Sequence, residues 1–363
     1  MKNLDLLRAV AVLCVFSAHL LNSLGLCNPG SLGRFGVIIF FVHTSLVLMG
    51  SLDRLEKTGL TNKWRLSGAF YIRRFFRIYP LAVFTVLLTR LLSIPTGPFS
   101  TYQWVGTRAF LSNLALTQNL TYDPDVLGPL WSLPLEVQMY VMLPLAYLIV
   151  RKGKYRSLAL WIISVALALT LPQISARLNV FSFAPCFSSG IVAYDLMRNS
   201  RRKMPAWTFP LAILAILIAF GPLDNISLSL PGKLPRAWCL SLMSGLVIAG
   251  VRDGALVYAQ PLAHWIAEHS YGIYLSHMVI FWLALDVVKF RNPWLRCLIL
   301  VAGSAGVPVL LYRIIENPLV AVGAGIARLF TPAYVVPLAV PSVPVSMRPR
   351  SMGSSAVAAG VRL

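Results

Sequence analysis

Residues 10–27 read VAVLCVFSAHLLNSLGLC, and residues 35–51 read FGVIIFFVHTSLVLMGS. Neither stretch contains an Asp, Glu, Lys or Arg. A helix that crosses the hydrocarbon core of a bilayer, about 30 Å thick, needs roughly 20 mostly apolar residues. The two stretches therefore predict two consecutive membrane-spanning helices.

The composition of the whole chain agrees with this interpretation. Of its 363 residues, 57% are apolar and 12% are charged, which excludes an ordinary soluble domain and a disordered chain. The net charge is +20, but the basic residues cluster between apolar blocks, which argues against nucleic-acid binding. The five cysteines form no Cys-x-x-Cys pair, so neither a disulfide framework nor a metal site is predicted.

Eleven apolar blocks are bounded by charged residues, Pro or Gly, and ten of them are expected to span the membrane. The eleventh, 104–120, is rich in polar residues and is interpreted as an external amphipathic or re-entrant segment. The fold class is therefore all-α, a polytopic bundle of about ten transmembrane helices. The predicted spans are 10–27, 35–51, 78–94, 132–150, 158–172, 180–197, 206–222, 237–251, 270–288 and 294–312.

The distribution of Lys and Arg predicts the orientation. With ten spans and both termini in the cytoplasm, 23 of these residues lie on the cytoplasmic side and nine outside, as the positive-inside rule requires. No cleavage site follows the first apolar run, so we expect that helix to be retained. We expect an integral membrane domain over 1–330 and, because Pro recurs in the last stretch, a disordered cytoplasmic tail over 331–363.

Ionisable residues inside predicted spans are costly and are candidates for function. Arg8 and His19 lie eleven positions apart on the first helix, about three turns, so they share a face with His19 about 16 Å deeper. Glu136 follows Trp131 and Ser132 near the external start of its span, and His19 is a possible cationic partner for it. The alternative is that His19 is a packed histidine and Glu136 an interhelical strut.

Three arginines, Arg73, Arg74 and Arg77, are expected at the cytoplasmic mouth of the third span. Arg74 and Arg77 are three apart and would point the same way on a helix, where they could clamp a phosphate. The alternative is a charge cluster held by lipid headgroups. His43 and His277 are interpreted as structural or substrate-lining residues rather than as the catalytic base.

The chain resembles the acyltransferase 3 family, membrane-bound acyltransferases that commonly O-acetylate bacterial glycans. LDLLRAVAVLCVFSAHL at 4–20 is similar to the family's opening helix, with Arg and His separated by ten residues, and GRFGVIIFFVHTSLVLMG at 33–50 resembles its second helix. FYIRRFFRIYPL carries an Arg-x-x-Arg element, and GPLWSLPLEVQMYVMLPL resembles the family's Trp-Ser-Leu-x-x-Glu segment. EHSYGIYLSH and IIENPL resemble its last spans, so five elements match in order.

The chain departs from the family's pattern in two places. His43, Thr44 and Ser45 stand where an apolar residue, Ser and Gly usually follow Phe-Phe-Val, and Val137 stands where a second Glu often occurs. Both departures concern the pocket wall and therefore the choice of substrate. Members with an external hydrolase-like domain are much longer, so we expect only the membrane part here.

The resemblance implies an O-acyltransferase of polysaccharide biosynthesis in the bacterial inner membrane. It would move an acyl group, most commonly acetyl, from acyl-CoA to a hydroxyl of an exopolysaccharide, an O-antigen or a lipo-oligosaccharide, with acetyl-CoA as a co-substrate and no resident cofactor. His19 would be the base and Glu136 would orient it. Arg8, Arg73, Arg74 and Arg77 would hold the CoA phosphates, and the substrate pocket would include His43, Trp131, Ser132, Tyr274 and His277.

Two alternatives from other classes remain. A flippase or transporter of a lipid-linked glycan would use buried His and Glu to relay protons without making a bond. A membrane sensor would use the arginine cluster to bind anionic lipid, although no sizeable soluble output domain is evident. Direct transfer and an acyl-histidine intermediate are both compatible with the sequence.

Overall fold

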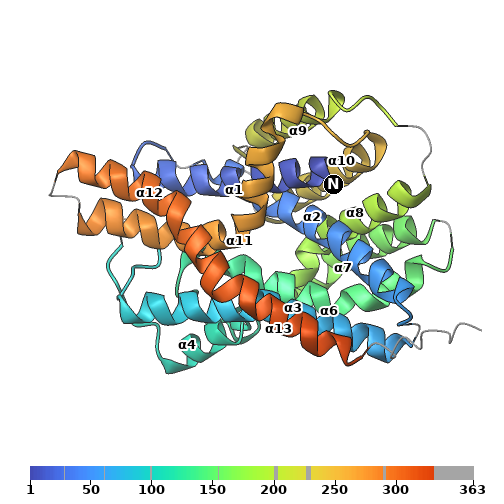
Figure 1. Cartoon of the computed structure of the whole chain (residues 1–363), viewed down its shortest axis with the longest axis horizontal. Helices are drawn as coiled ribbons and strands as arrows, with labels where there is room; N and C mark the ends of the chain where they lie inside the picture. Colours follow the sequence, from blue (N-terminus) through green and yellow to red (C-terminus); the bar gives the residue numbers. More distant parts are fainter. Residues whose placement is uncertain are drawn as a thin grey trace, which may run out of the picture. The chain divides into compact units, whose positions relative to one another are not determined.

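The computed structural model describes residues 1–27, 29–60, 62–98, 100–153, 155–199, 203–225, 230–288 and 292–330. Across these ranges the chain forms helices and no β-strand, which confirms the predicted all-α class (Figure 1). The predicted tail, 331–363, lies outside the described residues.

The long helices have bounds that agree with most of the predicted blocks. They are α1 (Lys2–Ser23), α2 (Gly30–Lys57), α3 (Lys63–Leu91), α6 (Ser132–Val150), α7 (Arg156–Ile174), α8 (Val180–Asn199), α9 (Thr208–Asn225), α10 (Leu230–Gly250), α11 (Gln260–Trp282), α12 (Pro293–Leu311) and α13 (Asn317–Arg328). Two single-turn π-helical segments, η4 (Leu283–Val287) and η5 (Tyr312–Glu316), extend α11 and join α12 to α13.

Seven helical segments of the described chain are long and apolar enough to cross a membrane. Two apolar helices, Thr208–Phe220 and Leu234–Gly250, are shorter. Helix α3 covers most of the block 78–94 but begins earlier, at Lys63, and ends at Leu91. The membrane-helical fold is thus as expected, whereas the count of ten and the orientation stay predictions. The polar block 104–120 forms two short helices, α4 (Thr107–Leu114) and α5 (Gln118–Thr121), which are too short to span.

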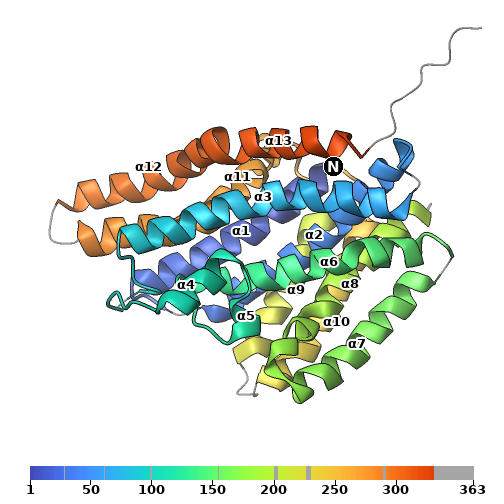
Figure 2. The same cartoon turned by 90° about the horizontal axis from the view of Figure 1, so that it is seen from below.

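Helices α2 and α8 form the centre of the bundle. Both are about 72% buried over their apolar windows, whereas α7 and the α12–α13 segment are 17% and 6% buried. Figure 2 shows α12 and α13 along one edge, next to α3, with α7 at the opposite edge. The peripheral helices therefore present apolar surface outward, as expected of helices that face lipid.

Glycines allow α2 to approach its neighbours closely. A Cβ at Gly36 would lie 2.5 Å from the carbonyl oxygen of Ala11 on α1, and one at Gly190 on α8 would overlap the Val42 carbonyl oxygen and Ser45 Oγ. Small residues at helix contacts are typical of membrane bundles, in which close van der Waals packing drives association.

Helix α11 packs alongside α1 and runs in the same direction (Figures 1 and 2). Near the start of α1, the Asn3 side chain accepts hydrogen bonds from the amides of Gly254 and Ala255 and donates to the Arg252 carbonyl, in the connection that precedes α11. Further along, Arg8 faces Ser270 and His19 faces His277. Contacts along α1 thus join it to a segment more than 250 residues later in the sequence.

Candidate active site

Charged and polar side chains from five elements meet in the interior of the bundle. Arg8 Nε donates a hydrogen bond of 2.6 Å to Ser270 Oγ on α11. Arg77 of α3 forms an ion pair with Glu316 of η5, whose side chain is fully buried. The Tyr140 hydroxyl donates to Glu136 on the same helix, α6. These contacts place cations, carboxylates and hydroxyl groups from α1, α3, α6, α11 and η5 around one interior region.

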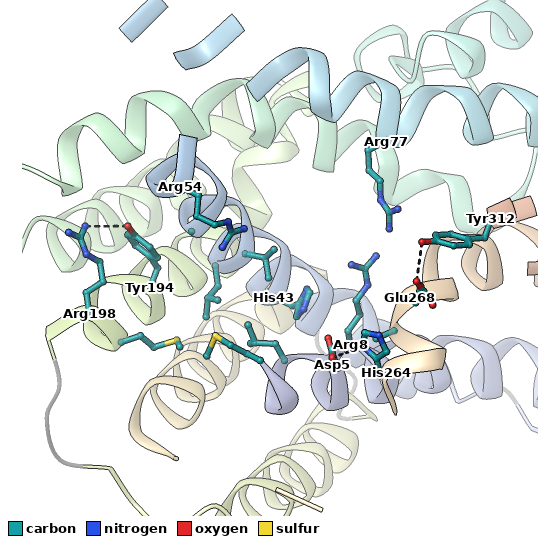
Figure 3. A pocket seen from close by; sticks show the side chains of 17 residues that line it. Asp5, Arg8, His43, Arg54, Arg77, Tyr194, Arg198, His264, Glu268 and Tyr312 are labelled. Carbon is teal, nitrogen blue, oxygen red and sulfur yellow. Dashed lines mark hydrogen bonds and ion pairs between the residues drawn. The ribbon is translucent and has the colours of Figure 1, made fainter. Parts of the chain in front are cut away.

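A cavity of about 560 Å³ opens onto this region (Figure 3). It is lined by α1, α2, α3, α8, α11 and η5, and Figure 3 shows the side chains of Arg8 and Arg77 converging from opposite walls. Ligand pockets commonly measure 300–1,000 Å³. The cavity therefore has the size and the cationic lining expected for an anionic organic ligand.

Two smaller hollows share lining residues with the cavity and extend it inward. One, of about 70 Å³, is lined by Arg8, Arg74, Arg77 and Glu136, among others. The other, of about 60 Å³, shares Arg8 and Glu136 and reaches Ser132 and Tyr274; its lining also includes Phe40, Thr44, Ser270 and Tyr271. The three spaces form a series from the end of α2 that carries Arg54 to the start of α6.

The predicted pairing of His19 with Glu136 is not present. Among the described residues, no hydrogen bond or ion pair joins the two side chains; the charged groups that act on Glu136 are Arg8 and Arg74. The reason is the level at which α6 begins. The chain enters the bundle through η1 (Gly128–Trp131), where Pro129 and Leu130 are buried, so Glu136 lies one turn further inside, at the level of Arg8.

His19 instead lies beside His277. The two ring centroids are 5.2 Å apart, and Phe16 and Phe281 pack against the His277 ring. His19 is partly buried and His277 is 1% exposed. The first and eleventh helices therefore bring two imidazoles together at the level where the sequence predicted one.

The hydrogen bonds of His277 indicate its tautomer. Nδ1 lies 3.1 Å from the Ile273 carbonyl oxygen, which only accepts, so Nδ1 carries the proton. Nε2 then bears a lone pair, and it is buried without a hydrogen-bond partner among the described residues. A buried acceptor without a donor needs an explanation, and a ligand hydroxyl would supply one.

Tyr274 stands between the histidines and the hollow that contains Glu136. Its hydroxyl donates to the Pro129 carbonyl oxygen at 2.5 Å and lies 2.7 Å from Ser132 Oγ. Its ring is 6.1 Å from the ring of His277. Tyr274 and Ser132, both predicted for the substrate pocket, thus form the wall between the two groups.

The arginine cluster lies in the interior of a continuous helix, α3. Asn62 caps α3 by accepting from the amides of Trp64 and Arg65, so the helix already runs for about three turns before the cluster. Arg74 and Arg77 line the same hollow, as their spacing predicted. Arg73 is absent from that lining, and the strongest charge that acts on it is Arg328 of α13.

Of the remaining predicted pocket residues, His43 lines the described spaces and Trp131 does not. His43 is 4% exposed and lines both the cavity and the first hollow. Trp131 packs against Phe183, with ring centroids 5.7 Å apart, and lines none of the three spaces. His43 is therefore close to the cations, whereas Trp131 supports the fold around η1.

Several residues of this site were not singled out from the sequence. Glu316 has a detectable signal, since it is the one acidic residue after Asp286 and lies in an apolar run. Tyr140 lies one turn after Glu136, a spacing that allows their contact. Ser270 carries no such signal, because a serine hydroxyl in an apolar helix commonly bonds to its own backbone, and Tyr271 is one of two tyrosines in SYGIYL.

Comparisons with known proteins agree with one another. A family model described as "Acyltransferase domain" matches residues 1–313. The chain is 26% identical to Acyltransferase MdmB of Streptomyces mycarofaciens, over 76% of this chain and 77% of that protein, and 23% identical to Nodulation protein 10 of Rhizobium leguminosarum bv. viciae, over 87% and 92%. It is 26% identical to Peptidoglycan O-acetyltransferase OatA of Listeria monocytogenes, over 87% of this chain and 55% of that protein. No solved structure matches.

Proposed function

The chain belongs to the acyltransferase 3 family and is a membrane enzyme that transfers acyl groups, and we propose that it moves an acetyl group from acetyl-CoA to a hydroxyl of an exported glycan. The observation that carries this proposal is the series of spaces described above. It runs from a cavity with several arginines to Tyr274, whose ring centroid is 6.1 Å from that of His277.

The donor half of the proposal uses the charge and shape of that series. Acyl-CoA has phosphates at one end and a thin, uncharged pantetheine arm that ends in the thioester. Arg8 and Arg77 would attract its phosphates into the cavity, where low dielectric strengthens charge-assisted contacts. The arm would then extend through the two narrow hollows, past Tyr274, towards His277 and His19.

In the proposed reaction, His19 is the general base. Its neutral imidazole would take the proton of the acceptor hydroxyl as that oxygen attacks the acyl carbon. The new carbon–oxygen bond forms, the carbon–sulfur bond breaks, and the proton passes to the departing thiolate to give CoA. In the variant with an acyl-histidine intermediate, the imidazole itself attacks first.

His277 takes the positioning role first assigned to Glu136. Its free Nε2 would accept a hydrogen bond from an N–H of the His19 ring and so direct the other His19 nitrogen towards the acceptor hydroxyl. Glu136 would instead balance the charges of Arg8 and Arg74 at the inner end of the donor site, held by Tyr140. Both carboxylates of the site, Glu136 and Glu316, would then balance the positive charges of the arginines.

The proposed class of acceptor is inferred from the names of the related proteins. One is named a peptidoglycan O-acetyltransferase and another a nodulation protein, so sugar hydroxyls of the cell envelope or of a lipo-oligosaccharide are the acceptors of choice. The donor is made in the cytoplasm, so the cavity would open to that side. This agrees with the proposed location in a bacterial inner membrane with the N-terminus and the 331–363 tail cytoplasmic.

A transfer assay with purified protein tests the proposal. The protein in detergent is incubated with radiolabelled acetyl-CoA and, in separate reactions, peptidoglycan fragments, an O-antigen and a chitooligosaccharide. Label in an ester that mild alkali releases from one acceptor supports the proposal. Label on none of them, with heat-treated protein as the baseline, contradicts the choice of acceptor; if CoA also fails to bind, the donor is wrong as well.

A further inference from the structure

The outer part of the 560 Å³ cavity contains a second group of cations that the mechanism above does not use. We propose that Arg54 and Arg198 form a separate anion subsite that binds the 3′-phosphate of the CoA ribose, while Arg8 and Arg77 face the diphosphate. This inference rests on the proposed donor and adds to it a means of selecting the phosphorylated coenzyme.

The cavity extends far enough along α2 to have two distinct ends. The residues of α2 that line it are His43, Leu46, Val47, Gly50 and Arg54, which form one face of the helix. Eleven residues at 1.5 Å each separate His43 from Arg54, about 16 Å. An apolar strip therefore lies between the inner cations and the outer ones.

Arg54 is the free cation of the outer end. Within the described part of the chain, its guanidinium has no hydrogen bond or ion pair, and it is exposed. Figure 3 shows the side chain directed into the cavity. A Cβ at Gly50 would lie 3.6 Å from Arg54 Nη1, so the guanidinium lies over the space that this glycine leaves open.

Arg198 faces the same space from α8. Its Nη1 donates to the Tyr194 hydroxyl at 3.2 Å and lies 4.0 Å from Asp53 Oδ1. Lys57 takes the other oxygen of Asp53, at 2.7 Å. One carboxylate is thus shared by two cations, and the remaining donors of Arg198 are available to an anion.

The acidic residues of the cavity lie on the opposite wall and are already engaged. Asp5 Oδ2 is 2.9 Å from His264 Nδ1, and the Tyr312 hydroxyl donates to Glu268 at 3.0 Å (Figure 3). The wall of the cavity formed by α2 and α8, which carries Arg54 and Arg198, is therefore the more positively charged wall. A ligand with two separated phosphate groups matches two cationic ends better than a single headgroup phosphate does.

Binding measurements with two coenzymes test the subsite without an acceptor. The dissociation constants of CoA and 3′-dephospho-CoA are measured by titration calorimetry for the wild type, Arg54→Gln, Arg198→Gln and Arg65→Gln. Arg65 is an exposed arginine at the start of α3 that does not line the cavity and serves as the matched control.

We expect the wild type and Arg65→Gln to bind CoA about tenfold more tightly than 3′-dephospho-CoA, as the loss of one charge-assisted contact predicts. Arg54→Gln should lose this preference, binding both at the weaker level, and Arg198→Gln should lose part of it. Equal binding of both coenzymes by the wild type, or an Arg54→Gln variant that keeps the preference, overturns the subsite while the donor stands. If neither coenzyme binds, the proposed donor fails too.

Anionic lipid is the other source of a phosphate at this end. The same titrations are repeated in nanodiscs of phosphatidylcholine alone and with phosphatidylglycerol. A lipid site predicts that phosphatidylglycerol weakens both coenzymes equally and that Arg54→Gln abolishes this effect without changing the CoA preference. That result contradicts the proposal.

Discussion

The rings of His19 and His277 lie 5.2 Å apart, one on the first helix of the bundle and one on the eleventh. Contacts between α1 and the segment that leads into and forms α11 recur from Asn3 to His19, so this proximity is held by the packing of the two helices and not by one pair alone. The pair lies beyond Tyr274 from the cationic cavity. The proposed base, His19, and the donor-binding cation Arg8 thus lie at different levels of the same helix pair.

Replacing His19 with Gln should abolish transfer, because the proposed base is lost and an amide cannot take the proton. We expect at least a 100-fold fall in kcat, the lower end of what a general base contributes. The measurement is acetyl transfer by purified protein, with the thermal midpoint as the control for folding. A variant that retains more than a tenth of the activity would remove His19 from the chemistry.

Two substitutions of His277 distinguish the roles of its two ring nitrogens. Asn places an amide NH₂ where Nδ1–H bonds to Ile273, but it has nothing at the position of Nε2. We expect His277→Asn to keep its thermal midpoint within a few degrees and to lose at least tenfold in kcat. His277→Gln, whose amide reaches the Nε2 position, should recover part of that rate. Equal rates for both variants would indicate a packing role only.

The membrane fold and most of the donor-side residues could be predicted from the sequence, because apolar length and helical spacing are local properties. Arg74 and Arg77 face one hollow, as a spacing of three requires, and Arg8 and His19 lie on the same side of α1. Spacing along one helix is set by its geometry and does not depend on what packs around it.

Relationships between helices could not be predicted in the same way. The depth of Glu136 depends on η1, which enters the bundle before α6 begins, and a block boundary drawn at Ser132 places that residue at the surface. Pairing His19 with Glu136 from similar distances to span ends therefore failed. The His19–His277 contact likewise depends on the register of α1 and α11, which no local pattern encodes.

The buried ion pair between Arg77 and Glu316 should be needed for stability. Glu316→Gln leaves the guanidinium of Arg77, which is 24% exposed, without its counter-charge. Breaking a buried pair costs about 3–5 kcal/mol, and partial exposure of Arg77 favours the lower figure. Thermal unfolding in detergent measures the loss.

A second variant distinguishes charge from packing at this pair. Replacing both residues with Met removes the unpaired charge, so Arg77→Met with Glu316→Met should recover much of the midpoint lost by Glu316→Gln. The double variant should nevertheless bind CoA more weakly than the wild type, because Arg77 lines the donor cavity. A double variant as unstable as the single one would show that the pair acts through shape.

Close packing of α8 on α2 should be sensitive to one methyl group. In Gly190→Ala the new Cβ overlaps two α2 groups, the backbone carbonyl of Val42 and Ser45 Oγ, and the carbonyl cannot rotate away. Overpacking of this kind costs about 1–3 kcal/mol, so the thermal midpoint should fall by several degrees. Since α2 carries Arg54 and α8 carries Arg198, the preference for CoA over 3′-dephospho-CoA should weaken as well.

Gly306→Ala is the matched control: a Cβ there meets nothing within 4 Å, and that glycine lies exposed on α12. It should leave both quantities unchanged or raise the midpoint slightly. Equal midpoints for the two variants would mean that α8 can move away from α2 at no cost, and the two arginines would then not be held in place by this contact.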